Sequence, residues 1–205
     1  MTPKKLSLVL LWMGMTLSFI SAAQNTKAVE QILHNSFRPE GVMGMEPITQ
    51  DEVQAFCSNV KLRDSQAGHI KQTEMQKKNM DEIKPPSDGK FLGDWRSGEK
   101  IAQNGRGASW SDKPKTPNGG SCYNCHQIDP KEISFGTLGP SLAGYGKLRG
   151  NSEALVQYTW NRISNAKAYN ACSSMPRFAH FQLLTEQQIK DVMALLLDPE
   201  SPVNQ

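Results

Sequence analysis

Two cysteines separated by two residues and followed directly by a histidine constrain this chain more than any other feature. The motif is Cys122-Tyr-Asn-Cys125-His126. A CxxC pair is used in zinc sites, in thiol–disulfide redox centres and in covalent haem attachment. A zinc site needs about four ligands, and the remaining cysteines and histidines follow no regular spacing. A thioredoxin-like redox pair requires a strand and a helix around it, and no alternating strand pattern occurs in the sequence.

The histidine directly after the second cysteine is the signature of c-type haem attachment. The two thiols add to the two vinyl groups on one edge of the haem, and about one helical turn carries both sulfurs to that edge. The same turn places His126 under the iron as an axial ligand. The sequence therefore predicts one covalently bound haem c, held by Cys122, Cys125 and His126.

Met175 is the best candidate for the second axial ligand. It lies in a predicted loop and is followed by Pro176, which stiffens the loop and keeps it out of a helix. A methionine is more commonly a core filler. That interpretation suits Met193, which lies on the apolar face of the predicted last helix.

The stretch FGTLGPSLAGYG, residues 135–146, is predicted to support the proximal histidine. Metal-bound histidines normally donate their other ring N–H to an outer acceptor, and the carbonyl of Pro140 is placed to serve as that acceptor. Pro140 and Leu142 are expected to pack against the imidazole and the haem. The glycines of this stretch allow the backbone to run close to the macrocycle.

The first 23 residues are predicted to be an export signal. Lys4 and Lys5 precede an apolar run over 6–20, and small residues then precede a cleavage site before Gln24. A membrane anchor is the alternative, but the run is short for a span, which needs about 20 apolar residues. Removal of the signal takes away Lys4 and Lys5, which lowers the number of basic side chains from 23 to 21 against 20 acidic ones. The processed protein is therefore nearly neutral, and its charge gives no support for nucleic-acid binding. We expect a periplasmic protein with no membrane segment after processing.

Helical periodicity predicts a mainly α protein in two parts. Residues 24–90 form a polar extension, with helices over 27–38 and 49–63 and a helix-permissive stretch over 64–84. Thr49 and Glu52 have capping-box spacing, and Cys57 lies on the apolar face of the second helix. Residues 91–205 form a small domain with long loops and with helices over 91–105, 152–164 and 185–197, the last with a capping box of Thr185 and Gln188.

The order CxxCH, GPxL and MPxF between two terminal helices resembles a class I cytochrome c over about residues 91–198. That family packs its terminal helices across each other at one haem edge. The stretches GEKIAQNGRG, GGSCYNCH, GTLGPSLAGYG and SMPRFAHFQLLTEQQIKDVMALLLDPESPV more narrowly resemble SoxX, the monohaem subunit of the SoxAX cytochrome of bacterial sulfur oxidation. Ala179 departs from the glycine that commonly follows MPxF there.

The resemblance implies a heterodimer with SoxA in which His126 and Met175 bind the iron of this chain. Such a complex oxidatively joins thiosulfate to a cysteine of the carrier SoxY. This is an L-cysteine S-thiosulfotransferase reaction, and its chemistry is expected to take place on SoxA. This chain would accept the electrons and pass them to a small periplasmic cytochrome, and no catalytic residue is assigned to it. The alternatives are a free periplasmic carrier for another oxidoreductase and a haem sensor with a labile Met175 bond.

Cys57 and Cys172 remain once the haem thiols are assigned. Two further thiols in an exported chain favour a disulfide, which would tie the extension to the loop before Met175. Two alternatives stay open: Cys57 as a buried free thiol, and Cys172 as an iron ligand. His180, just beyond the Met175 loop, is expected to be exposed or to face a partner.

Overall fold

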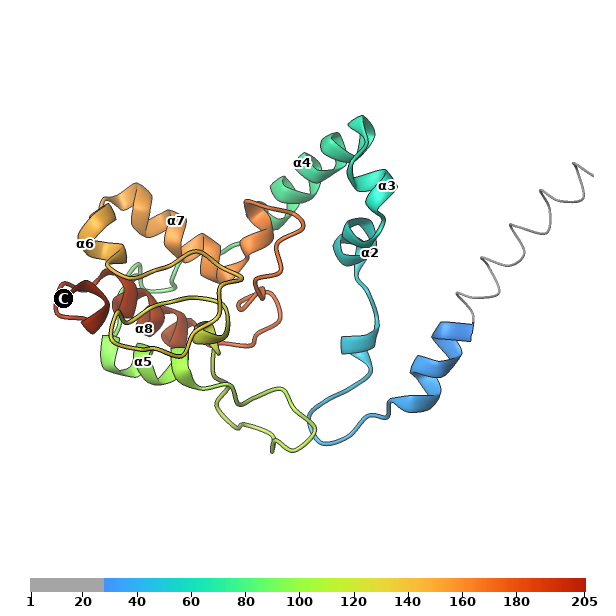
Figure 1. Ribbon diagram of the computed structural model, residues 1–205, viewed down its shortest axis with the longest axis horizontal. Coiled ribbons are helices and arrows are strands. Elements are labelled where there is room, and N and C mark those ends of the chain that lie inside the picture. Colours follow the sequence, from blue (N-terminus) through green and yellow to red (C-terminus); the bar gives the residue numbers. More distant parts are fainter. Residues whose placement is uncertain (1–27) are drawn as a thin grey trace, which may run out of the picture.

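The computed structural model describes residues 28–205 and shows a mainly α protein (Figure 1). The export signal predicted for 1–23 lies outside the described residues. Within them, β pairing is limited to an isolated bridge between Glu40 and Met43. No helix among them is both long and apolar enough to span a bilayer. Besides a helical stretch over 28–36, the chain forms η1 Glu46–Ile48, α2 Glu52–Ser58, α3 Val60–Arg63, α4 Gln66–Asp81, α5 Trp95–Gln103, η2 Cys122–Asn124, α6 Tyr145–Arg149, α7 Glu153–Ser164, η3 Ala166–Ala168, α8 Glu186–Leu197 and η4 Pro202–Asn204.

Residues 91–205 are called the haem domain below, and the long helix α8 near its end forms the centre of its packing. The predicted capping box is present, since the Thr185 side chain accepts from the Gln188 backbone and the Gln188 side chain accepts from the Thr185 backbone. Every residue from 189 to 197 is buried, which confirms and extends the predicted apolar face. Burial of so many aliphatic side chains makes this helix the main contributor of hydrophobic stabilisation to the domain.

Helices α5 and α8 pack across each other, as the class I architecture requires (Figure 1). Their close approach depends on Gly98, where an added Cβ would clash with the backbone carbonyl of Asp191. One turn later the fully buried Ala102 continues the contact face of α5. Small residues at these two positions let the helix backbones approach one another, and this fixes one end of the domain.

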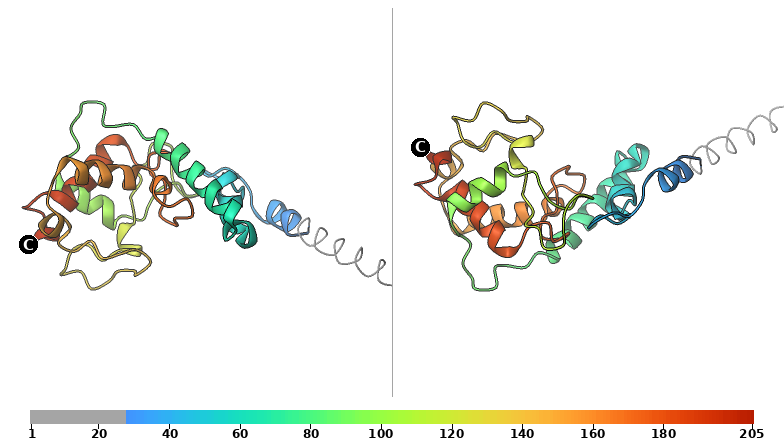
Figure 2. Two further views of the ribbon diagram at one scale, coloured as in Figure 1. Left: turned by 90° about the horizontal axis from the view of Figure 1, so that it is seen from above. Right: turned by 90° about the horizontal axis from the view of Figure 1, so that it is seen from below.

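The extension forms an arm beside the haem domain, and Figure 2 shows α2 to α4 on the side away from the C-terminus. The predicted capping box of Thr49 and Glu52 is wrong. Asp51 is the N-cap of α2 and exchanges hydrogen bonds of 2.7 and 2.8 Å with Gln54, because the preceding residues form η1. Asn59 then ends α2 and caps α3, so one long predicted helix becomes two short ones.

The helix predicted over 27–38 is present over 28–36, but its apolar face contacts little of the protein. Val29, Ile32 and Phe37 are each at least half exposed. The helix lies at the far end of the arm, away from the haem domain (Figures 1 and 2).

The segment between α4 and α5 attaches the arm to the haem domain. Trp160 of α7 is 3% exposed and donates from its indole N–H to the carbonyl of Lys84 at 2.9 Å. Phe91 packs edge-on against the same indole, with ring centroids 5.6 Å apart. Asp88 accepts at 2.6 Å from the buried Lys190 of α8. This linker is therefore an integral part of the packing of α7 and α8.

Candidate haem site

The Cys-Cys-His motif folds into a single tight turn around η2. The backbone N–H groups of Cys125 and His126 both donate to the carbonyl of Cys122, at 3.1 and 3.0 Å. Both cysteines are free thiols, and Cys122 packs against the hydrophobic core. Burial raises the pKa of the Cys122 thiol to about 12, so it stays protonated at neutral pH.

His126 is held in one orientation by the Gly-Pro loop. Its Nδ1 lies 2.7 Å from the carbonyl oxygen of Pro140. Because a carbonyl can only accept, Nδ1 must carry the proton, and the lone pair of Nε2 is left for a metal. The predicted partnership of His126 and Pro140 is thus present in the structure, although the Pro140 ring itself is exposed.

Backbone hydrogen bonds fasten this loop to the Cys-Cys-His turn. Gly139 donates to the carbonyl of Cys125 and Leu142 donates to that of Gln127, both at 2.8 Å. A Cβ at Gly139 would clash with the imidazole of His126. A glycine is therefore needed where the loop passes over the ring, and the loop and the turn form one rigid unit.

Met175 lies in an irregular segment between η3 and α8, as predicted. It is partly buried and packs against the same core as Cys122 and Leu142. The segment is fixed on both sides: the Met175 N–H donates to the Ser173 hydroxyl at 3.2 Å, and the Ala179 N–H donates to the carbonyl of Ser164 at 3.0 Å. Its position opposite His126 across an iron remains a prediction.

A disulfide joins Cys57 of α2 to Cys172, three residues before Met175. The two Cα atoms are 5.5 Å apart and the cysteines are separated by 115 residues in the chain. With its sulfur in this bond, Cys172 is not a candidate iron ligand in this structure. Phe56, Met75 and Ala171 form a small buried cluster around the bond.

An ion pair close to the disulfide also joins the arm to the Met175 loop. The guanidinium of Arg177, which is 4% exposed, contacts the carboxylate of Asp51. Hydrogen bonds from Gln54 and Arg177, and the charges of Arg177 and Lys167, hold the pKa of Asp51 below its usual value against the opposing effect of burial. The segment that carries the candidate axial methionine is thus held by the extension at two points.

The donor set of this site fits haem c. Two free thiols on one turn match the two vinyl groups, and the oriented Nε2 of His126 and the thioether of Met175 are suitable axial ligands. Gly139 keeps the face of the imidazole clear of side chains. Cys122, Leu142 and Met175 would line the apolar surroundings of the group.

Sequence reasoning missed a polar contact behind the turn. Tyr123, between the two cysteines, is 7% exposed and donates to the carboxylate of Glu99 at 3.0 Å, and its oxygen accepts from the Asp129 N–H at 3.2 Å. Burial raises the pKa of Glu99 against the hydrogen bonds it accepts from Tyr123 and Gln103, and the nearby acid Asp129 raises it further. No local pattern identifies this contact, because α5 and the turn meet only in the folded chain.

Comparison with known proteins agrees with this geometry. Residues 98–198 match the family model for cytochrome c. The chain is also 39% identical over 157 residues to an "Uncharacterized lipoprotein" of Aquifex aeolicus (strain VF5), a match that covers 76% of this chain and 73% of that protein. The family match covers α5 from Gly98 onward, the Cys-Cys-His turn, the Met175 segment and α8, and residues 98–198 therefore form a cytochrome c domain.

Proposed function

We propose that this c-type cytochrome is the electron-accepting and relaying subunit of a periplasmic SoxAX complex. Electron transfer is the activity that the cytochrome c family supports. The SoxAX assignment rests on the resemblance to SoxX, above all on the run from Met175-Pro-Arg-Phe178 through α8 to the LLLDP tail. The partner SoxA would carry out the thiosulfate chemistry on the carrier SoxY, and a small cytochrome would receive the electrons.

The orientation of His126 is the observation that carries the electron-transfer proposal. Haem c, when bound, supplies a one-electron couple between ferric and ferrous iron. The Pro140 carbonyl keeps the Nε2 lone pair of His126 directed to one axial position. Met175 is proposed to fill the other, and a methionine ligand favours the ferrous state and raises the potential. With both positions filled by the protein, the chain would relay electrons and would not bind a substrate at iron.

The extension supports a partnered subunit in preference to a small diffusing carrier. Its first described helix exposes Val29 and Ile32 at the end of the arm, and the exposed Phe37 follows directly after it, although an unpartnered apolar surface is costly in water. The disulfide and the Asp51–Arg177 ion pair hold the arm against the haem domain. A carrier that meets its partners only briefly has little need for such an arm.

We place the protein outside the cytoplasm, where haem is attached to CxxCH motifs and where disulfides persist. The predicted export signal would take it there. The word "lipoprotein" in the name of the Aquifex relative describes that protein. The first cysteine of the present chain is Cys57, whose sulfur is in the disulfide.

Affinity capture of the tagged chain from thiosulfate-grown cells tests the assignment. We expect a larger c-type cytochrome to co-purify in equal amount, as detected by haem staining and mass spectrometry. Thiosulfate should not reduce the haem of the isolated chain. It should reduce this haem when the captured complex and SoxY are both present. Recovery of the chain alone would contradict the SoxAX assignment and would favour a free carrier for another oxidoreductase.

A further inference from the structure

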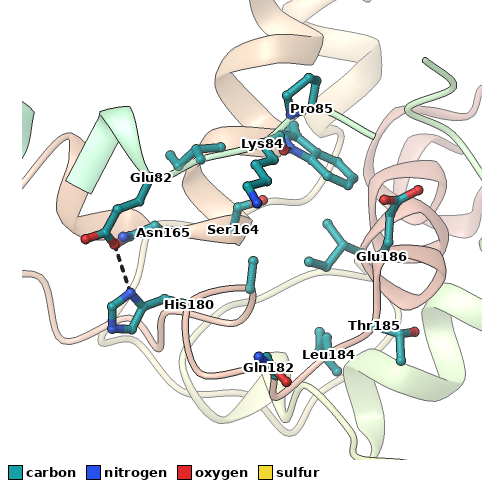
Figure 3. Close-up of a pocket in the computed structure, with 14 residues that line it drawn as sticks. Glu82, Lys84, Pro85, Ser164, Asn165, His180, Gln182, Leu184, Thr185 and Glu186 are labelled. Carbon is teal, nitrogen blue, oxygen red and sulfur yellow. Dashed lines mark hydrogen bonds and ion pairs between the residues drawn. The ribbon is translucent and has the colours of Figure 1, made fainter. Parts of the chain in front are cut away.

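A pocket of about 620 Å³ lies where the linker crosses the haem domain (Figure 3). Residues 82–85 of the linker form one wall, and Trp160 and Ser164 of α7 form another. Leu184 and Ile189 close it from the α8 side. None of Cys122, Cys125, His126 or Met175 lines this pocket, so it is distinct from the haem site.

Ser164 contributes an unpartnered polar atom to the pocket. The residue is 2% exposed, and its hydroxyl has no hydrogen-bond partner among residues 28–205. A buried hydroxyl without a partner carries a desolvation cost that the fold leaves uncompensated. Because the hydroxyl oxygen itself is buried, a ligand in the pocket would supply the missing hydrogen bond after the Ser164 side chain turns toward the cavity.

Lys84 contributes a positive charge. Its side chain extends from the linker into the pocket (Figure 3). Two acids also line the pocket: the Glu82 carboxylate is hydrogen-bonded to Nδ1 of His180 at 2.9 Å, and Glu186 forms an ion pair with Lys190 at 3.1 Å. Within the described part of the chain, Lys84 forms no ion pair, so its ammonium group is free to bind a ligand even though the carboxylates of Glu82 and Glu186 line the same pocket.

The remaining walls are mixed, since Asn165, Gln182 and Thr185 line the pocket beside a group of apolar side chains. Ile83, Pro85, Trp160, Leu184 and Ile189 all line the cavity. Its volume falls in the range of small-molecule sites, which are apolar with a few convergent polar groups. A small inorganic anion would satisfy Lys84 and Ser164 but would leave most of these apolar walls uncovered.

We propose that this pocket binds a small organic acid. Its carboxylate would accept hydrogen bonds from the Lys84 ammonium and the Ser164 hydroxyl, and its apolar body would lie against Trp160. A charge-assisted hydrogen bond between an ammonium and a carboxylate is stronger than a neutral one. Because Lys84 belongs to the linker and Ser164 to α7, the bound acid would join the extension to the haem domain.

Titration of the full haem-loaded chain with 2-naphthoate tests the proposal. Isothermal titration calorimetry should give saturable binding at one site per chain. The neutral amide 2-naphthamide should bind at least about tenfold more weakly, because it lacks the charge that Lys84 recognises. Absence of saturation, or equal affinity for the amide, would overturn the proposal.

Two variants assign the binding to this pocket. Lys84→Gln and Ser164→Ala should each weaken 2-naphthoate binding about five- to tenfold, whereas Lys90→Gln, an exposed linker lysine outside the pocket, should leave it unchanged. Without ligand, Ser164→Ala should have a thermal midpoint no lower than that of the wild type, because its hydroxyl has no partner to lose. Wild-type affinity in both variants, or a destabilised Ser164→Ala, would contradict the assignment.

Discussion

At the scale of single residues, the proposed axial pair, His126 and Met175, takes one side chain from each of two separate segments. We expect Met175→Ala to retain covalent haem, because Cys122 and Cys125 are untouched, but to lose the far-red absorption band of the methionine-to-iron bond. The visible spectrum of purified protein measures this directly. Met193→Leu is the matched control, since Met193 is fully buried in the core and should keep the band. An unchanged band in Met175→Ala would show that another residue binds the iron.

Glu99 gives a pH-dependent prediction. Its pKa is raised by burial, so the folded protein binds a proton there more tightly than the unfolded chain does, and stability falls as pH rises above the usual carboxyl pKa. Glu99→Gln keeps an acceptor for Tyr123 and removes the buried charge. We expect urea unfolding to show a more stable variant at pH 7 and a smaller difference at pH 4. Glu153→Gln at an exposed position of α7 is the control, and a variant less stable than wild type at pH 7 would contradict the account.

The local parts of the site could be predicted from the sequence. The spacing of Cys122, Cys125 and His126 and the glycine-proline loop together predicted the hydrogen bond to the Pro140 carbonyl, because all of these residues lie within one short stretch. The contact of Tyr123 with Glu99 could not be predicted in this way. It forms between α5 and the turn, and no periodicity or motif records which helix face meets which loop.

At the scale of secondary-structure elements, α7 and α8 matched prediction because periodicity and capping residues agree there. The extension was less predictable. The spacing of Thr49 and Glu52 predicts a helix cap at Thr49, but η1 ends there and the N-cap of the helix lies two residues later, at Asp51. Helix α6 was not predicted, because it is only five residues long and begins after Gly144 in a left-handed conformation. Helix α4 has few apolar residues, and it packs on η3 partly through the 2.9 Å bond between Asn165 and Asn79.

The crossing of α5 and α8 is the element-level contact most sensitive to volume. In an isolated helix, Gly98→Ala would stabilise by about 1 kcal/mol. Here the added Cβ would clash with the Asp191 carbonyl, so we expect a net loss of about 1–3 kcal/mol in unfolding free energy. Chemical denaturation of the haem-loaded protein measures it. Lys100→Ala, on the exposed side of α5, should change stability by less than about 0.5 kcal/mol, and a stabilised Gly98→Ala would refute the close crossing.

At the scale of the whole molecule, the disulfide between Cys57 and Cys172 closes a covalent loop of 115 residues. The entropy model gives about 4.7 kcal/mol for a loop of about 100 residues, and typical measured values are about 2–4 kcal/mol. We expect the double variant Cys57→Ala/Cys172→Ala to lose about 2–4 kcal/mol in unfolding free energy and to keep its haem. Mass spectrometry of non-reduced peptides should recover the linked pair from wild type. Free thiols at both positions in wild-type protein would contradict the bond.

The raised pKa of the partly buried Cys122 thiol bears on which cysteines form the disulfide. Four cysteines can pair in three ways, and a chain exported as predicted would meet an oxidising environment before its haem is attached. Disulfides form by attack of a thiolate, and a thiol with a pKa of about 12 provides almost none at neutral pH. Once the turn has folded, Cys122 is thus a poor competitor for Cys57 and Cys172. The raised pKa of Cys122 therefore disfavours its entry into a disulfide and favours the observed pairing of Cys57 with Cys172.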